Sequence, residues 1–194
     1  MKPIHLILIA LIGYYSCSPE VVRHGPGVVA VATPQQKNIG SPQSFEYKGY
    51  TVKPLATFAI EARILSKERY WMGREAELSP VDLALGWGSM SDETVLDQLD
   101  ISQGGRFYYW RANSLPIPAG EISSHSANMH LIPADENVAS VLKGRTREGD
   151  IVRFSGYLVS VVHPDGWRWK SSLTRNDTGA GACELVYVET LQVL

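Results

Sequence analysis

The stretch of sequence that decides the fold is GDIVRFSGYLV, residues 149–159. It predicts a turn at Gly149, a strand over 151–154, a break at Gly156 and a second strand over 157–162. Glycine inside a strand pattern marks a bend or the close approach of another backbone. We therefore expect an antiparallel sheet that curves strongly at this point.

Short strands continue through the rest of the last third. A turn at 164–166 (PDG) leads into a strand over 167–173, and a glycine-bearing loop over 176–181 precedes a closing strand over 184–188. Several short strands joined by tight turns are typical of small barrels. This part of the chain therefore predicts a small, partly open barrel.

The middle of the chain mixes strand and helix signals. Residues 58–65 alternate with a period of two, and residues 106–111 (RFYYWR) have the composition of a strand. Helix starts are expected at Ser79, where SPVD supplies a cap and a proline, at Ser91 and at Asp135. The predicted fold is thus α+β and mainly β, with short helices inserted before the barrel.

The composition fits one globular domain and argues against two kinds of partner. The chain has 194 residues, 44% of them hydrophobic, which is enough for a sizeable core. The formal net charge is -2, and Lys and Arg are scattered along the chain. Nucleic acid and anionic membrane surfaces bind to clusters of Lys and Arg. Because the chain has no such cluster, we expect it to bind neither.

The N-terminus predicts export. Residues 6–12 (LILIALI) form an apolar run behind Lys2 that is shorter than the about 20 residues a membrane span needs, and it fits a secretion signal. Cys17, in Ser-Cys-Ser, resembles the lipidated cysteine that ends a bacterial lipoprotein signal. Tyr14 stands where that pattern has an aliphatic residue, so cleavage without lipid is the alternative. We expect a signal peptide over 1–17, a lipid anchor as the sole membrane attachment, and a periplasmic or outer-membrane-associated protein in a Gram-negative cell.

Residues 18–44 are rich in Pro, Gly, Ser and Gln and predict a linker to a single globular domain over 45–194. The run VVAVA, residues 28–32, interrupts this composition and could pair as an edge strand. If Cys17 carries lipid, the mature protein has no internal disulfide. A bridge between Cys17 and Cys183 is the alternative.

Two resemblances accompany these patterns. The Gly-Asp-x-Val…Gly-x-Leu-Val pattern of residues 149–159 is similar to segments of OB-type and SH3-like barrels and covers only the last third. Across residues 50–188 the chain also resembles a group of bacterial exported proteins of unassigned function. The segments that carry this second resemblance are LSPVDLALGWGSMSD (78–92), SANMHLIP (126–133) and GAGACE (179–184). It implies a single domain and no particular chemistry.

A metal site is the first candidate for chemistry, in SSHSANMHLIP, residues 123–133. His125 and His130 are five residues apart, which places them on opposite faces of a strand and about 140° apart on a helix. The chain has no HExxH or CxxC motif to complete a ligand set. We therefore predict no metal and no cofactor, and expect a polar loop over 126–130.

A cysteine nucleophile is the second candidate. Cys183 follows a glycine-bearing loop whose backbone N–H groups could stabilise an oxyanion, with His130 as the base and Asn128 or Asp177 to orient it. The alternative is that Cys183 is a small buried hydrophobic residue. Cys183, Leu185 and Tyr187 would share one face of a strand, which favours burial.

The third candidate is an aromatic and basic binding face. It would comprise Trp87, Tyr109, Arg111, Trp167 and Trp169, the residue types most enriched at recognition hot spots. The alternative is a barrel core rich in aromatic residues. Together with His130, this face makes a binding module for a small ligand or an envelope partner the leading functional hypothesis. A hydrolase using Cys183 and His130 is the competing one, and a purely structural subunit is the third.

Overall fold

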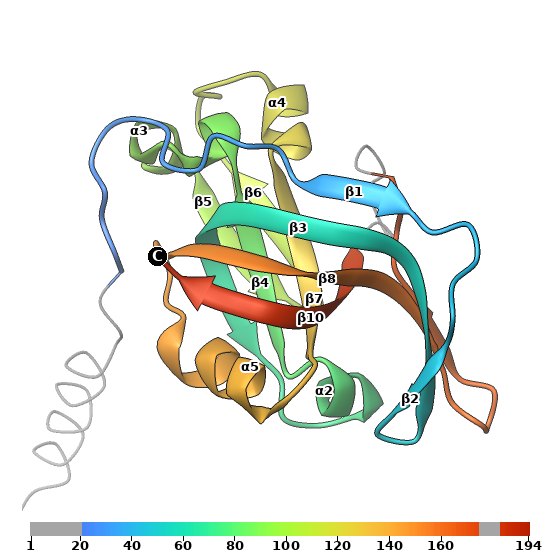
Figure 1. Ribbon diagram of the computed structural model, residues 1–194. Coiled ribbons are helices and arrows are strands. Elements are labelled where there is room, and N and C mark those ends of the chain that lie inside the picture. The colour runs from blue at the N-terminus through green and yellow to red at the C-terminus, as the bar shows by residue number, and fades with distance from the viewer. Residues whose placement is uncertain (1–20, 175–182) are drawn as a thin grey trace, which may run out of the picture.

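Strands carry most of the chain, with short helices between them (Figure 1). The computed structural model describes residues 21–174 and 183–194. The strands are β1 (Gln35–Asn38), β2 (Phe45–Tyr47), β3 (Tyr50–Arg69), β4 (Val81–Gly86), β5 (Asp100–Gly104), β6 (Phe107–Arg111), β7 (Ser126–Pro133), β8 (Ile151–Val162), β9 (Arg168–Lys170) and β10 (Glu184–Val193). The helices are α2 (Arg74–Leu78), the 3-10 helix η1 (Gly88–Ser91), α3 (Glu93–Leu96), α4 (Ala119–Ser124), α5 (Glu136–Ser140) and the π-helix η2 (Val141–Arg145).

Five strands close into a barrel in the order β3-β4-β7-β10-β8, because β8 pairs again with β3. Neighbouring strands are antiparallel except β7 and β10, which run parallel, and α5 with η2 connects β7 to β8. This order, with its one parallel pair, is that of an OB-type barrel. The predicted α+β, mainly β fold with a partial barrel and short helices is confirmed, and the barrel starts at β3 rather than in the last third.

Bulges and one close approach give the barrel its curvature. The register of β3 shifts against β8 after Pro54 and against β4 after Ile64, and such bulges bend a strand. The break expected at Gly156 is instead a point inside the continuous strand β8 where β10 comes close. A Cβ atom at Gly156 would lie 1.9 Å from the carbonyl oxygen of Tyr187, so only glycine fits there.

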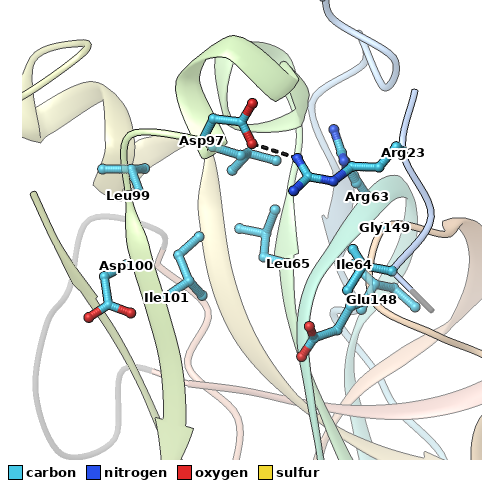
Figure 2. A pocket seen from close by; sticks show the side chains of 12 residues that line it. Arg23, Arg63, Ile64, Leu65, Asp97, Leu99, Asp100, Ile101, Glu148 and Gly149 are labelled. Atoms are coloured by element: carbon cyan, nitrogen blue, oxygen red, sulfur yellow. Dashed lines mark hydrogen bonds and ion pairs between the residues drawn. The ribbon is translucent and has the colours of Figure 1, made fainter. Parts of the chain in front are cut away.

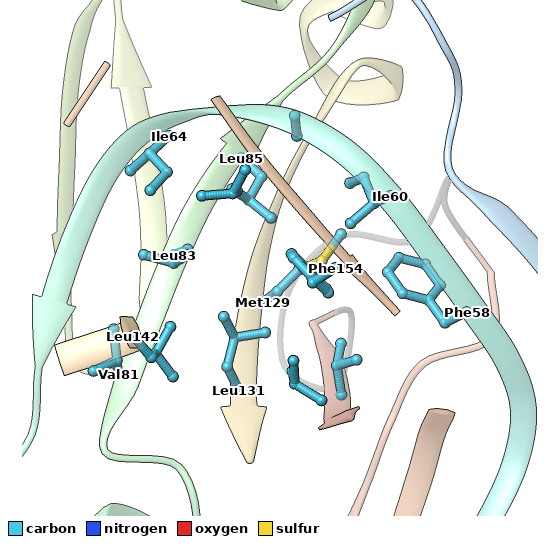
Figure 3. Packing of buried hydrophobic residues seen from close by; sticks show 14 of the residues in the cluster. Phe58, Ile60, Ile64, Val81, Leu83, Leu85, Met129, Leu131, Leu142 and Phe154 are labelled. Carbon is cyan, nitrogen blue, oxygen red and sulfur yellow. The ribbon is translucent and has the colours of Figure 1, made fainter. Parts of the chain in front are cut away.

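The barrel interior is packed with side chains from all five strands (Figure 3). Phe58 of β3 and Phe154 of β8 have ring centroids 6.2 Å apart, and Leu83 and Leu131 come from β4 and β7. Leu142 of η2 closes one end, where Figure 1 places α5. Each fully buried side chain of this kind stabilises the fold by about 1.5–3 kcal/mol, so this cluster holds the barrel together.

The helix predicted from Ser79 is wrong, because the chain forms strand β4 there. Val81, Leu83 and Leu85 alternate along it and all enter the barrel core. The Ser79 hydroxyl donates to Asp82 Oδ1 at 3.3 Å instead of capping a helix. The alternation of the side chains that enter the barrel core therefore outweighs the local helix-start motif. The expected helices at Ser91 and Asp135 do form, as α3 and α5.

The polar loop predicted over 126–130 is also wrong, since these residues begin strand β7. Met129 and Leu131 point into the barrel core, while Asn128 and His130 lie on the opposite face and are still 95% buried. A second layer, which includes the β5–β6 hairpin, covers that face. Because both faces of this strand are buried, its sequence lacks the usual alternation of apolar and exposed polar residues.

The predicted linker over 18–44 differs from the structure in its described part, residues 21–44. Ala30 is fully buried, and its N–H donates to Ser91 Oγ at 3.1 Å. No strand forms at 28–32; the first described strand is β1, which pairs with β3. Because its backbone groups find partners on η1 and α3, this segment belongs to the domain, and we call residues 21–30 the N-terminal strap.

Candidate functional site

The candidate site lies on the outer face of the barrel, where β4, β7 and β10 are neighbours. The register places Asp82 opposite His130, and His130 opposite Leu185 of β10. Cys183 is two residues before Leu185, so it shares a face with Asn128 and His130. We call the group that gathers here the outer-face cluster, made of Asp82, Arg106, Asn128, His130, Trp169 and Cys183.

Asp82 is the buried centre of the cluster, with none of its surface exposed. Its Oδ1 accepts hydrogen bonds from Arg106 Nη1 at 2.7 Å and from the Ser79 hydroxyl at 3.3 Å. Its Oδ2 lies 2.9 Å from His130 Nδ1, but the pair lacks the alignment of a hydrogen bond. Neither atom has another hydrogen-bond partner among the residues that the structure describes. The Asp82 carboxylate therefore lies directly against the Nδ1 edge of the His130 ring.

Arg106 is held by the turn between β5 and β6. It adopts a left-handed conformation with φ of 73°, next to Gly105 at φ 59°. Its N–H donates to the Tyr70 hydroxyl at 3.1 Å, and its guanidinium lies 3.7 Å from the Tyr70 ring centroid. Burial, and then the charge of Asp82, raise the pKa of Tyr70. Tyr70 therefore stays a neutral platform for the guanidinium.

Asn128 links the hairpin to Cys183. Its side chain accepts from Gln103 Nε2 at 2.6 Å and donates to the carbonyl oxygen of Arg106 at 3.0 Å. The Cys183 sulfur lies 3.9 Å from Asn128 Nδ2 and 3.9 Å from the same carbonyl. The thiol is half-buried, so it sits at the border of the cluster. The sulfur thus lies between an amide donor and a carbonyl acceptor.

Two tryptophans of the β9 region cover one side of the cluster. The Trp169 ring centroid lies 4.9 Å from that of His130 and 6.1 Å from that of Trp167. The guanidinium of Arg106 is 5.4 Å from the Trp169 ring, and that of Arg74 is 5.4 Å from the Trp167 ring. Both indoles are half-buried. Apolar ring faces thus meet charged and hydrogen-bonding groups at one place.

Three residues predicted for the binding face do not belong to it. Trp87 is 2% exposed and packs in the barrel core, so its prediction as a ligand residue is wrong. Tyr109 and Arg111 lie on the outward face of β6, where the ring of Tyr109 contacts that of Phe107 at 6.5 Å. The strand alternation sends Trp110 the other way, into the apolar layer between the hairpin and β4.

The histidine pair is separated as the spacing predicts. His125 caps the end of α4, with Nδ1 3.0 Å from the Glu121 carbonyl oxygen, whereas His130 lies in the cluster. Over residues 21–174 and 183–194, no three His, Cys, Asp or Glu side chains are grouped as metal ligands. Asp177, the other proposed orienting residue, and Cys17 lie outside the described residues.

Sequence reasoning missed Asp82 and Arg106, the ion pair at the centre of the cluster. The sequence does contain a signal for Asp82, which places a charge inside the apolar run VDLALG. A buried strand tolerates such a charge only when it is paired. Arg106 follows Gly104-Gly105, a hairpin turn that the sequence also offered. Nothing in the sequence indicated that the two would meet.

The strands of the outer-face cluster, β4, β7 and the start of β10, lie within residues 78–92, 126–133 and 183–193. Within the described part of the chain, no helix is long and apolar enough to cross a membrane. No known family model, no curated protein and no solved structure matches this chain.

Proposed function

We propose that this protein is a binding module whose outer-face cluster holds a small neutral saccharide. The observation that carries the proposal is the contact of Trp169 with His130, 4.9 Å between ring centroids, beside the Arg106–Asp82 pair. Indole faces stack on the C–H faces of sugar rings, and carboxylate, amide and guanidinium groups bind their hydroxyls. The net charge of -2 disfavours an anionic polymer such as nucleic acid.

The position of the cluster on the barrel supports this proposal. In OB-type barrels, the face of the second and third strands and the loops beside it bind oligosaccharides or oligonucleotides. Here the second and third barrel strands are β4 and β7, which supply Asp82, Asn128 and His130. Because the β5–β6 hairpin covers these three residues, a ligand would meet the cluster at its border, where Arg106 and Trp169 are partly exposed. Fold-level analogy alone does not assign a function, so the weight rests on the residues of the cluster.

The energetic cost of the cluster supports a functional role as well. Asp82 and His130 are almost fully buried, and Asp82 Oδ2 and His130 Nδ1 lack aligned hydrogen bonds. A buried ion pair adds little net stability compared with apolar residues of the same size. Polar groups retained at such a cost are more readily explained by recognition than by folding.

Titration of the full chain with neutral oligosaccharides, followed by tryptophan fluorescence, tests the binding proposal. We expect a saturable change that is lost in Trp169→Ala, because this substitution removes the ring that faces His130. Tyr109→Ala is the matched control, since Tyr109 lies on the exposed face of β6 and should bind like the native chain. Saturable binding that survives Trp169→Ala would contradict the placement of the site.

Export by a signal peptide over 1–17 and lipidation at Cys17 are part of the same proposal. Both are supported by the apolar run 6–12 and by Ser-Cys-Ser around Cys17. The anchor would be the only membrane attachment. Metabolic labelling with a fatty-acid precursor should mark the native chain and not Cys17→Ser, and equal labelling of the two would contradict the anchor.

A Cys183-dependent hydrolase is the second candidate, because Asp82 lies 2.9 Å from His130 Nδ1 and Cys183 shares their face. In such a mechanism, His130 takes the thiol proton as the sulfur attacks an acyl carbon, and the imidazolium, stabilised by Asp82, returns that proton to the leaving group as its bond to the acyl carbon breaks. Water, deprotonated by His130, then hydrolyses the thioester and frees Cys183. Asn128, beside the sulfur, would then help to position the thiol.

Alkylation with iodoacetamide separates the two candidates. The hydrolase requires Cys183 to react faster than a free thiol near neutral pH and to slow down in His130→Ala. If Cys183 is inert while oligosaccharide binding is intact, only the binding module stands.

A further inference from the structure

A hollow of about 300 Å³ lies beneath the N-terminal strap and is separate from the outer-face cluster (Figure 2). Its walls come from the strap, β3, α3, the start of β5 and the loop before β8. A volume of about 300 Å³ is at the lower end of the range for small-molecule sites. The hollow is therefore large enough for a short aliphatic ligand.

The strap forms a fixed wall of this hollow. Glu93 of α3 accepts hydrogen bonds from Arg23 Nη1 at 2.7 Å and from the backbone N–H groups of His24 and Gly25 at 2.7 and 2.8 Å. The N–H of Val22 donates to the carbonyl oxygen of Glu148 at 2.9 Å. Contacts on two sides hold the strap, so the hollow is preformed rather than created by a ligand.

The floor of the hollow is apolar. Leu65 of β3 and Ile101 of β5 face the space in Figure 2, and Leu96 and Leu99 complete the apolar lining. These side chains are only partly covered by the protein, apart from Leu65, which is 9% exposed. A ligand with methylene groups would gain by covering them.

The lining holds three acids, Asp97, Asp100 and Glu148, and two arginines, Arg23 and Arg63, of which Arg63 is paired with Glu93. Asp97 is paired with Arg23 at 2.6 Å, but Asp100 and Glu148 form no ion pair with any residue that the structure describes. Arg111 lies opposite Asp100 in the hairpin and likewise makes no ion pair with it. Figure 2 shows Ile101 between the Asp100 and Glu148 side chains, so the two carboxylates stand on either side of an apolar patch.

We propose that this hollow binds an aliphatic diamine or polyamine, with one ammonium group at Asp100, another at Glu148 and the methylene chain over Leu65 and Ile101. Two separated carboxylates match two ammonium groups, and the apolar floor between them matches the spacer. An anion is excluded by these two carboxylates, and a monoamine satisfies only one of them. This site is independent of the saccharide proposal, because it shares no residue with the outer-face cluster.

Calorimetric titration of the full chain with 1,6-diaminohexane, at low salt, tests the proposal. We expect saturable binding that weakens with added salt, and binding of hexylamine that is about tenfold weaker because one charge-assisted hydrogen bond is missing. Asp100→Asn and Glu148→Gln should each weaken diamine binding about tenfold and reduce the preference over hexylamine. Glu189→Gln is the matched control, an exposed acid on β10 away from the hollow, and should bind as the native chain does.

The location of binding is read independently from methyl resonances. On addition of diamine, the methyl signals of Leu65, Leu99 and Ile101 should shift with the calorimetric affinity, and those of the barrel core, such as Leu83, should not. Equal affinity of the native chain and the Asp100→Asn, Glu148→Gln double variant would overturn the proposal. So would the absence of saturable binding by the native chain at millimolar diamine.

Discussion

The two faces of β4 and β7 are equally buried and chemically opposite. On the inner face, Leu83 and Leu131 pack among other apolar side chains of the barrel. On the outer face of the same two strands, Asp82 and His130 lie side by side with almost no exposed surface. One pair of strands therefore carries both the main core and a buried polar cluster.

The two faces therefore contribute differently to stability and to ligand recognition. Apolar burial is favourable wherever it occurs, because it removes area from water at about 25 cal/mol per Å². Burial of Asp82 is unfavourable except for its contacts with Arg106, Ser79 and His130. The inner face should therefore dominate stability, and the outer face should dominate recognition.

The largest effect is expected from Leu131→Ala on the inner face. Leu131 is fully buried, so truncation removes apolar contacts and leaves a cavity that the barrel cannot fill. We expect a loss of about 3–4 kcal/mol in the free energy of unfolding, measured by urea denaturation. A loss below about 1 kcal/mol would show that the inner face does not carry the stability assigned to it.

Removal of one member of the outer ion pair should come next. Arg106→Met leaves the Asp82 carboxylate buried without its cation, while Ser79 alone cannot compensate its charge. We expect a loss of about 2–3 kcal/mol at neutral pH, which the second substitution Asp82→Asn should largely reverse. Additive losses in the double variant would mean that the two side chains do not act as a pair.

The strap gives a smaller effect that appears only in acid. Hydrogen bonds from Arg23 and then from the His24 N–H lower the pKa of Glu93 from 4.5 to about 2. The contribution of Glu93 to holding the strap is therefore complete above pH 4.5 and is lost as the pH falls through about 2. Amide shifts of His24 and Gly25, followed by NMR, should titrate with the lower midpoint, and a midpoint near 4.5 would contradict the contact.

The smallest effect is expected on the exposed face of the β5–β6 hairpin. Tyr109 is 51% exposed and lies beyond both the core and the outer-face cluster. Tyr109→Ala should change the free energy of unfolding by less than about 0.5 kcal/mol in the same urea assay. A larger loss of unfolding free energy would show that residues outside the inner face also stabilise the fold.

The sequence predicts the fold class better than the elements that build the site. Alternation in β3 and the glycine-bearing pattern around Gly156 lead to a curved, mainly β barrel, because both signals are local. The errors fall on β4 and β7, where Asp82, Asn128 and His130 stand on strands that are buried on both faces. A local pattern cannot show that a second layer will cover such residues, so β4 was predicted as a helix and the start of β7 as a loop.

The candidate site was predicted in part for the same reason. His130, Asn128, Cys183 and Trp169 were expected as chemistry-bearing residues, and the parallel pairing of β7 with β10 brings them to one face. Their juxtaposition depends on strand order, which residues far apart in the chain determine together. Trp87 was misplaced because an aromatic residue between glycines looks the same in a core as on a surface.

Concerted replacement of the outer cluster by apolar residues tests most directly whether it serves recognition rather than stability. In the triple variant Asp82→Leu, Arg106→Met, His130→Leu, the ion pair of the cluster is removed together with the histidine that faces it. We predict a free energy of unfolding within about 1 kcal/mol of the native chain, or higher, together with loss of oligosaccharide binding. A loss of several kcal/mol, comparable to that of Leu131→Ala, would contradict this account and make the cluster a structural element of the fold.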